Sequence, residues 1–507
     1  MPIAPFTVLG LLAAGLLVLA LAVRRRSRLP LPPGPPGLPI LGNALDIPAE
    51  YGWVKFAEWS QQYGDVTHLT ALGRHIVILG SQEAVNDLLV KRGANYSDRP
   101  VLPMAYLSGW QDATGLVMNG KRLQAVRRLL ARVLSPRACQ QHASMQQQTS
   151  LSLVQKLFRR STNKLANDTH WFASHIILKL GHDPLIELNE AAMRCFCEAT
   201  NPSWIVNIFP IFRHMPQWFP GGGFHRQARI FRSTVAAMYD VPLNKVKEAM
   251  SHSFVATLLR GENGAGVSAE EEDLIRRAAG DMYGGGGETT ASALQLFYLA
   301  MVLSPEVQRR AQAELDSVIG EDRLPTMEDR PSLPFIEAIV KEVYRWNPAL
   351  PAAIPHCTTE EDVYRGWRIP AKTMLIPNIW QITHDPKLYP DPLSFKPDRY
   401  MSTSVENESI SGSGKPAQNP DPRSFVFGFG RRECPGRHLA DASVWIAIAV
   451  SLATFNIMPR KNASGKPVLP IPRFSGATVS QPEEFPYVLE PRSEQALQWL
   501  QADAKTS

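Results

Sequence analysis

The chain has 507 residues, a formal net charge of +6 and 44% hydrophobic residues. This length and composition allow a large buried core and exclude a disordered or fibrous protein. The basic excess is small, and the sequence contains neither an isolated basic block nor a zinc-finger spacing, so we expect no nucleic-acid partner.

The N-terminus begins with an apolar run. Residues 1–23 carry no charged side chain and are followed at once by RRRSR at 24–28. About 20 apolar residues suffice to cross a bilayer as a helix, and basic residues after the span hold that side in the cytosol. We therefore predict an uncleaved transmembrane signal-anchor helix over 1–23. A cleaved signal peptide, ending near Ala22, is the alternative, but its positive charge would lie on the wrong side of the apolar run.

A basic stop and a proline-rich hinge fill residues 24–45. The prolines of LPLPPGPPGLPILGN fix an extended backbone and remove amide donors, which predicts a stiff spacer. Within it, Leu38, Ile40 and Leu41 are expected to dock against the body of the protein. Residues 46–507 show no internal repeat and no obvious boundary, so we expect one domain there.

Short strands and a helix are predicted directly after the hinge. Residues 66–80 read as two strands around a turn at Gly73, and a helix is expected from Ser81 to about Gly93.

Helical patterns dominate the next 250 residues. In 304–320, Ser304 can cap a helix, Pro305 suits its first turn and Gly320 can end it. Prolines, short strands and loops fill 349–425 before helical character returns. The predicted fold class is mainly α with small β-sheets.

Four consecutive glycines interrupt one helical pattern. Each of Gly284 to Gly287 costs about 1 kcal/mol relative to alanine inside a helix. Taken alone, the run leaves a loop and a helix equally open.

The cysteines do not form a disulfide pattern. Their number is odd and their spacing contains no CxxC pair, so a reduced, cytosol-facing body is expected. The five are Cys139, Cys195, Cys197, Cys357 and Cys434.

The stretch FGFGRRECPG, residues 427–436, places Cys434 among glycines and arginines before a helix. A thiolate needs its charge stabilised. Arg431, Arg432, Arg437 and the positive end of the following helix are expected to do this. The glycines permit tight turns and the close approach of a flat partner.

This stretch resembles the haem-binding loop of the cytochrome P450 family. The matching positions are Phe427, Gly428, Gly430, Arg432, Cys434 and Gly436. The resemblance implies a cytochrome P450 fold for 46–507, haem b as cofactor and Cys434 as the axial iron ligand, whose electron donation favours O–O cleavage. It also implies that Arg432 contacts a haem propionate. Cys357 is the second candidate for the iron ligand but lacks the glycine frame.

Other family motifs occur in the expected order. GGETT resembles the distal helix, which implies that Thr289 and Glu288 deliver protons when O2 is cleaved. Glu342 and Arg345 share one helix face, and by resemblance they form a buried charge network with Arg399.

Two further positions match the family with less support. His356 and Arg127 stand where the family contacts the propionates, although a solvated loop position is an equally open reading of His356. The family usually has a tryptophan where Leu123 stands, so one propionate donor is lost.

The family also implies partners. The chain shows no flavin or nicotinamide fingerprint, so electrons are expected from NADPH–cytochrome P450 reductase. That partner would dock on a basic face, and O2 would be the co-substrate. The candidate basic residues are Arg127, Arg128, Arg132, Arg431 and Arg437.

Two apolar segments, 101–117 and 204–224, are predicted to form the roof over the substrate, although core packing explains them equally well. The second segment is also a candidate for contact with the lipid interface. No fixed charge stands out as a substrate anchor, which favours an apolar small molecule such as a terpene. The sequence texture is most similar to fungal enzymes of specialised metabolism. Sequons at Asn95, Asn167, Asn407 and Asn462 are taken as chance matches.

The resulting prediction is a haem-thiolate monooxygenase in the endoplasmic reticulum membrane, single-pass, with its catalytic domain facing the cytosol. An isomerase or dehydratase on the same fold is the first alternative, and the Glu288–Thr289 pair argues against it. A membrane scaffold or a cysteine-dependent hydrolase is the second, but the sequence shows no base for Cys434.

Overall fold

The computed structural model describes residues 29–159, 165–178, 183–201, 204–249, 254–261, 266–401 and 419–502. The predicted membrane span 1–23 and the basic stop at 24–28 lie outside these residues, as do Asn407 and most of the polar connector before the cysteine loop. Within the described ranges no helix is both long and apolar enough to cross a membrane.

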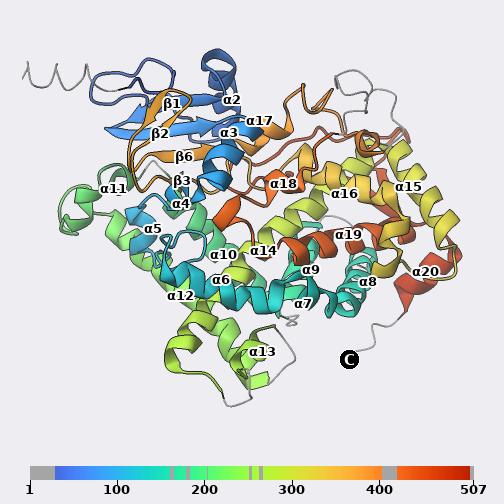
Figure 1. The fold of residues 1–507 in the computed structure, drawn as a ribbon. Helices are drawn as coiled ribbons and strands as arrows, with labels where there is room; N and C mark the ends of the chain where they lie inside the picture. Colours follow the sequence, from blue (N-terminus) through green and yellow to red (C-terminus); the bar gives the residue numbers. More distant parts are fainter. Residues whose placement is uncertain are drawn as a thin grey trace, which may run out of the picture.

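Helices make up most of the molecule, and the longest, α14, runs through its centre (Figure 1). The helices before it are α2 Gly52–Tyr63, α3 Gln82–Val85, α4 Gly93–Tyr96, α5 Pro103–Leu107, α6 Lys121–Leu134, α7 Pro136–Gln140, α8 Ala143–Arg159, α9 Leu165–Leu178, α10 Asp183–Thr200, α11 Ile205–Ile208, α12 Phe224–Ala249 and α13 Phe254–Leu259. From α14 onward they are α14 Ala269–Leu303, α15 Pro305–Val318, α16 Pro334–Trp346, α17 Ile379–Thr383, α18 Arg423–Val426, α19 Arg437–Thr454 and α20 Glu494–Gln501.

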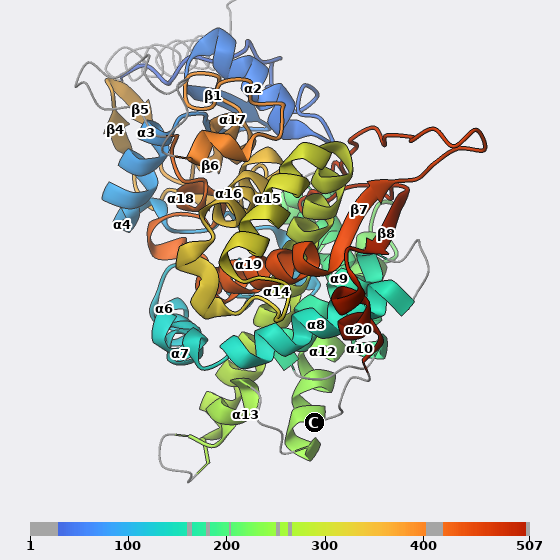
Figure 2. The ribbon, with the colours of Figure 1, turned by 90° about the vertical axis from the view of Figure 1, so that its right-hand side faces the viewer.

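The largest sheet joins the two halves of the chain. Its strand order is β1-β2-β6-β3, with β1 and β2 antiparallel and β2 parallel to β6. Two further sheets of two antiparallel strands, β4–β5 and β7–β8, are present among the described residues, and Figure 2 shows the second of them beside α20. The strands are β1 Val66–Ala71, β2 Arg74–Leu79, β3 His356–Cys357, β4 Asp362–Tyr364, β5 Trp367–Ile369, β6 Met374–Pro377, β7 Phe455–Pro459 and β8 Tyr487–Pro491.

The strands predicted around Gly73 are confirmed, and so is the start of a helix near Ser81, whose hydroxyl caps it by accepting the backbone N–H of Ala84. The helix ends close to the predicted stop, with Lys91 as its last residue and Arg92 as its C-cap. A π-helical turn, Asn86–Lys91, ends the helix, and Gly93 starts α4.

The helix predicted over 304–320 is present as α15, but Ser304 does not cap it with its side chain. Ser304 ends α14 as well, donating its backbone N–H to Ala300, while its carbonyl accepts the first N–H groups of α15. Because the two helices share this residue, backbone groups satisfy the junction. Gly320 comes after α15 with a φ of 77°.

The hinge docks differently from the prediction. Leu38, Ile40 and Leu41 remain exposed, Ile40 by 91%. Contact is made instead by the backbone, where Pro33 accepts the N–H of His68 at 2.8 Å. A Cβ at Gly34 would lie 1.8 Å from the His68 carbonyl oxygen, so only glycine permits this approach.

The glycine run is helical, which excludes the loop reading. Helix α14 continues through it without a break. A Cβ at Gly286 would lie 2.6 Å from Cδ1 of Ile177 on α9, and one at Gly284 would lie 3.1 Å from Sδ of Met193 on α10. These glycines therefore let α9 and α10 pack directly on the backbone of α14, and that burial offsets their poor helix propensity.

Candidate haem-binding site

A cavity of about 360 Å³ lies between α14, α6, α19 and the cysteine loop. Nine of the residues predicted to serve the cofactor or the chemistry line it, namely Arg127, Glu288, Thr289, His356, Phe427, Gly428, Arg432, Cys434 and Gly436. These residues come from segments up to 309 positions apart, and the fold brings them around one space. The roles assigned to them remain predictions.

The cysteine loop forms a tight turn between α18 and α19. The backbone N–H of Cys434 donates to the Phe427 carbonyl at 2.6 Å, and Gly428 adopts a φ of 77°. Gly430 also has positive φ, and a Cβ there would lie 2.4 Å from the Leu89 carbonyl oxygen. The glycine frame thus turns the chain and lets it pack against the π-helical turn, while Cys434 faces the cavity.

The electrostatics of Cys434 differ from the prediction. Burial raises the pKa of its thiol, against the backbone N–H of Gly436 and the charges of Arg127 and Arg437, which lower it. Arg431 is exposed, and the guanidinium group of Arg432 points to backbone carbonyls instead. The local arginines therefore do not outweigh burial, and a thiolate here needs a further positive charge, which a ferric ion would supply.

Three guanidinium groups line the cavity with only backbone carbonyls as hydrogen-bond acceptors among the described residues. Arg432 donates to Ser97, Thr114 and Val117, and Arg127 donates to Glu433. The third, Arg99, was missed by the sequence reasoning and donates to Gly115, Ile354 and Pro355.

Among the described residues none of the three cations forms an ion pair with a carboxylate, although the charge of Asp98 acts on Arg99 and Arg432 from nearby. Burial lowers the pKa of Arg432 to about 10 and also lowers the pKa of Arg99, in both cases against the charge of Asp98. A buried cation is stabilised by an anionic partner, so this wall fits a group with two carboxylates, as the haem propionates have.

His356 lies on β3 against the same wall. Its Nδ1 is 2.7 Å from the Tyr96 carbonyl, which makes Nδ1 the protonated nitrogen and turns Nε2 away from Tyr96. Burial, reinforced by the charge of Arg99, lowers the pKa of His356. The solvated-loop reading is therefore wrong, because His356 is 3% exposed and neutral.

Leu123 is buried on α6 and lines the cavity one turn before Arg127. It offers no hydrogen-bond donor. The wall therefore depends on Arg127 and Arg99 for donors at this end.

The distal wall is a groove in α14. No atom lies within 4 Å of a Cβ built at Gly285, so this is the glycine that opens toward the cavity. Thr289, one turn later, donates its hydroxyl to the Gly285 carbonyl at 2.8 Å. The carboxylate of the neighbouring Glu288 is largely buried, and its Oε2 lies 3.4 Å from Nε2 of His170.

The predicted charge network lies behind the cavity. Glu342 accepts two hydrogen bonds from Arg345, both at 2.8 Å, and contacts Arg399 at 3.1 Å. Arg345 also donates to the carbonyls of Thr383, Pro392 and Ser394. The three charged side chains are almost fully buried, and removing one partner of such a pair costs about 3–5 kcal/mol.

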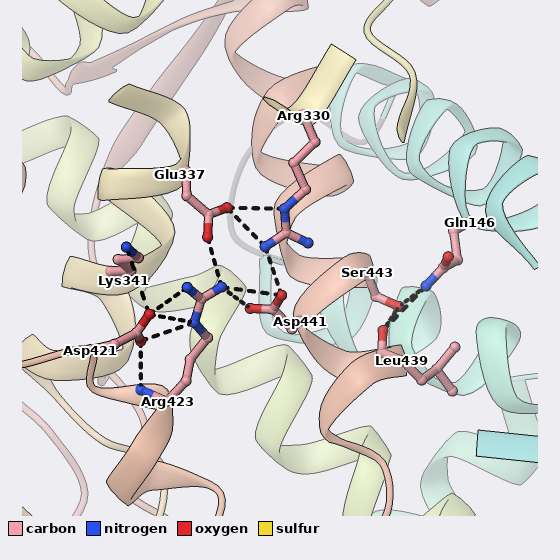
Figure 3. Close-up of polar contacts among 9 residues, drawn as sticks. All are labelled: Gln146, Arg330, Glu337, Lys341, Asp421, Arg423, Leu439, Asp441 and Ser443. Carbon is pink, nitrogen blue, oxygen red and sulfur yellow. Dashed lines mark hydrogen bonds and ion pairs between the residues drawn. The ribbon is translucent and has the colours of Figure 1, made fainter. Parts of the chain in front are cut away.

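A second charge network holds the two ends of the cysteine loop (Figure 3). Arg423, in α18 before the loop, contacts Glu337 of α16 at 2.7 Å and Asp441 of α19 at 3.3 Å. Arg330 bridges the same two carboxylates at 2.8 and 2.6 Å. The sequence reasoning missed this network because its members are far apart in the chain and form no local motif.

The roof over the cavity is only partly as predicted. Trp110, Ala113, Thr114 and Gly115 of the 101–117 segment line the cavity, but none of the described residues of 204–224 does. Met193 and Phe196 of α10 and Met238 of α12 take that place. Segment 204–224 lies outside the cavity and exposes Ile211, Trp218 and Phe219.

The site and fold define a class of protein. A glycine-framed cysteine faces a groove in a long helix across a cavity, and unpaired cations ring one end. This donor set fits a haem held through sulfur, with its carboxylates at the arginine wall.

The family model described as Cytochrome P450 matches residues 32–485, and the chain belongs to this family. The cofactor of this protein is haem b, and the protein is an enzyme of the monooxygenase type. The present chain is 37% identical in sequence to cytochrome P450 monooxygenase 208 of Postia placenta, and the alignment covers 97% of each of the two chains. It is 38% identical to cytochrome P450 monooxygenase claR of Ampulloclitocybe clavipes, covering 94% of this chain and 88% of the relative. It is also 37% identical to the tryptamine 4-monooxygenase of Psilocybe cyanescens, covering 96% of this chain and 98% of the relative.

Proposed function

We propose that this enzyme uses O2 and electrons from NADPH to oxidise an apolar small molecule of fungal specialised metabolism, such as a terpenoid. The observation that carries the proposal is the placement of Cys434 across the cavity from Gly285 and Thr289. When bound, the haem supplies the activation of O2. The chain's own residues hold the cofactor, shape the substrate space and present the Thr289 hydroxyl at the distal groove.

The cavity lining supports an apolar substrate. Side chains such as Trp110, Ile177, Phe196 and Met238 dominate the space near α14. The one carboxylate of α14 on this wall besides Glu288 is Asp281, and its oxygens already accept from Thr114 and Tyr239 at 2.6–2.8 Å. Glu288 lies beside His170, so both carboxylates that α14 brings to this wall already have partners within the protein.

Substrate binding tests this proposal. Spectral titration of the haem protein with sesquiterpenes is expected to give saturable shifts, followed by NADPH-dependent products in mass spectrometry. Tryptamine, the substrate class named for one relative, is the matched cationic probe. Selective binding of tryptamine over the terpenes would overturn the apolar assignment.

We also propose anchoring in the endoplasmic reticulum membrane through residues 1–23, with the catalytic domain in the cytosol. The uncharged run and the basic stop support it, as do the exposed Ile40, Trp218 and Phe219. The full chain is expected in the microsomal fraction after carbonate extraction, with added C-terminal glycosylation sites unmodified. Modification of those sites would contradict the topology.

NADPH–cytochrome P450 reductase is the proposed electron donor. Arg128, Arg132 and Arg431 are exposed near the cysteine side of the molecule, although Arg132 also lies 4.0 Å from Glu271 and Arg437 pairs with Glu433. An acidic partner surface would be attracted to these charges. Reduction by the reductase should slow as ionic strength rises, and more steeply in wild type than in Arg128→Gln/Arg431→Gln.

The reduced carbon monoxide difference spectrum tests the site itself. Wild type and Cys357→Ala are expected to show the long-wavelength Soret band of a thiolate-ligated haem, whereas Cys434→Ala is expected to lose it. The alternative chemistry, an isomerase or dehydratase, would keep the band but consume no NADPH with reductase. Retention of the band in Cys434→Ala would overturn the assignment of the ligand.

A further inference from the structure

A histidine that the mechanism above does not use lies between two carboxylates beside the distal groove. His170 of α9 has Nδ1 3.1 Å from Glu190 of α10 and Nε2 3.4 Å from Glu288 of α14. The ring is buried, with its side chain 10% exposed, and the three groups form a row across three helices. No sequence motif connects these positions.

The row runs from solvent to the cavity. Glu190 is 27% exposed at its outer end and lies 3.7 Å from the exposed Arg194. Glu288, at the inner end, lines the cavity next to Thr289. The close packing of α10 on α14, where a Cβ at Gly287 would lie 2.9 Å from Nδ2 of Asn189, holds the carboxylates on either side of the ring.

We propose that Glu190, His170 and Glu288 form a proton pathway from the surface of α10 to the distal side of the cavity. This inference rests on the proposed function, because only the reduction of O2 there consumes protons. Within it, His170 and Glu190 are positioning residues that act through Glu288.

The charge state of the ring supports this role. Burial disfavours the imidazolium, but the carboxylates of Glu190 and Glu288 outweigh burial and raise the pKa of His170 to about 9. Among the described residues, Arg194 of α10 pairs with Glu190, Tyr283 of α14 interacts electrostatically with Glu190, and Cys197 of α10 does so with Glu288. Asp168 lies two residues away on α9, Lys156 of α8 lies over Trp171 instead, and α13 carries no titratable group.

The proton transfer conserves atoms and charge. Nε2 of His170 lies 3.4 Å from Oε2 of Glu288 without the alignment of a hydrogen bond, so the ring first turns toward that oxygen and then gives it the proton. Glu288 becomes a neutral acid and then releases that proton into the cavity. Glu190 takes up one proton from solvent and becomes a neutral acid. It passes that proton to the bare nitrogen after the ring rotates toward it, which restores the imidazolium and the carboxylate. One proton has crossed from solvent to the cavity, and the three groups carry their original charges.

Turnover without substrate tests the pathway on the full-length haem protein with reductase. Release of hydrogen peroxide uses one NADPH and one proton per O2, whereas reduction to two waters uses two NADPH and two protons. A positioned acid contributes about 10²–10⁴-fold to proton transfer. We therefore expect the rate of water formation to fall by about 10²-fold in His170→Gln and Glu190→Gln, so that peroxide per NADPH approaches one.

Glu187→Gln is the matched control, because it removes the same charge from an exposed position on α10. Glu187→Gln is expected to keep the wild-type ratio of peroxide to NADPH. Glu190→Asp, which keeps a carboxylate, should return most of the way from the ratio of Glu190→Gln to that of wild type. If His170→Gln and Glu190→Gln keep the wild-type ratio of peroxide to NADPH, then Glu190, His170 and Glu288 form a structural charge cluster only, and the pathway is overturned.

A second readout does not depend on turnover. A raised histidine pKa adds stability that is complete below pH 6.5 and is lost as the pH rises through 9. The difference in melting temperature between wild type and His170→Gln should therefore shrink over that interval, and a difference independent of pH would contradict the buried imidazolium. Absence of the long-wavelength Soret band from the carbon monoxide spectrum of the wild type would contradict the proposed function. A normal band together with unchanged peroxide per NADPH in the His170 and Glu190 variants would contradict the pathway alone.

Discussion

Arg99 shows how a single buried cation can organise the wall of this site. Its guanidinium group holds the carbonyls of Gly115, Ile354 and Pro355, which belong to two segments about 240 residues apart. It therefore fixes the segment before α6 to the strand region that carries His356. The same group faces the cavity end where two carboxylates of the cofactor fit.

Replacing Arg99 should affect both stability and cofactor retention. Arg99→Leu would remove the donor of three partly buried carbonyls, and a buried group left without a partner costs at most about 1–3 kcal/mol. We expect a lower melting temperature and faster loss of haem to an excess of apomyoglobin. Arg99→Lys restores the charge but cannot span three acceptors, so haem loss should be intermediate.

Arg128→Leu, on the exposed side of α6, is the control and should lose haem at the wild-type rate. Equal haem loss in wild type and Arg99→Leu would show that Arg99 only stabilises the fold.

Single residues were predictable from the sequence where a short motif carried them. Cys434, Arg432 and Thr289 stand in local patterns, and the fold places all three at the cavity. Arg99, His170 and Glu190 stand in no such pattern, because their partners are far apart in sequence and only packing brings them together. Arg431, Arg432 and Arg437 were expected to stabilise a thiolate at Cys434, but burial outweighs the charges of Arg437 and Arg127 and raises the pKa of the thiol.

At the scale of elements, the glycines of α14 divide into two kinds. A Cβ at Gly284, Gly286 or Gly287 would press on the end of a side chain of α9 or α10, whereas one at Gly285 meets nothing within 4 Å. From the sequence, a loop and a helix were equally open for this glycine run. Glycine has a low helix propensity, and the run is helical because α9 and α10 pack against α14.

Two alanine variants separate these roles. Gly286→Ala places a methyl group against Ile177, and overpacking of this kind costs about 1–3 kcal/mol. Ile177→Val removes the clashing Cδ1 and should recover part of the loss in a thermal melt.

Gly285→Ala should instead stabilise α14 by up to about 1 kcal/mol while its methyl group fills the groove beside Thr289. Its expected signature is a higher melting temperature with weaker substrate-induced spectral shifts. A destabilised Gly285→Ala would contradict the open position assigned to this glycine.

Element boundaries were less predictable than element types. The strands around Gly73 and the helix after Pro305 were expected from turn and capping residues, and they are present. The π-helical end before Gly93 and the shared residue Ser304 depend on how the neighbouring elements pack in space, which residue spacing alone does not reveal. The roof was assigned partly to 204–224 for the same reason, since apolar content does not distinguish a cavity wall from an exposed surface.

At the scale of the whole molecule, buried histidines should set the pH range of stability. Burial lowers the pKa of His384 to about 3, with the charge of Arg345 adding to it, and burial next to His75 lowers that of His68 to about 4. A lowered pKa adds stability that is present above pH 6.5 and is lost as the pH falls toward 3–4. His170 acts in the opposite direction above pH 6.5.

The three histidines together place the maximum of their contribution close to pH 6.5. In urea unfolding followed by tryptophan fluorescence from pH 4 to pH 10, the urea concentration at the midpoint should be highest near pH 6.5 and fall toward both lower and higher pH. His384→Gln should flatten the acid side alone, and His170→Gln the alkaline side alone. A midpoint that rises below pH 6 in wild type would contradict the neutral state of the buried rings.

The parallel pairing of β2 with β6 has a consequence for biosynthesis. Ile76 of β2 pairs with Met374 of β6. About 300 further residues must therefore be synthesised after the β1–β2 hairpin before β6 can pair with it. At a translation rate of about 5–20 residues per second, that delay lasts tens of seconds. During this time the edge of β2 stays open beside the ribosome, and unpaired edges of this kind promote aggregation. Nascent chains released before residue 377 should therefore depend on chaperones to remain dispersed.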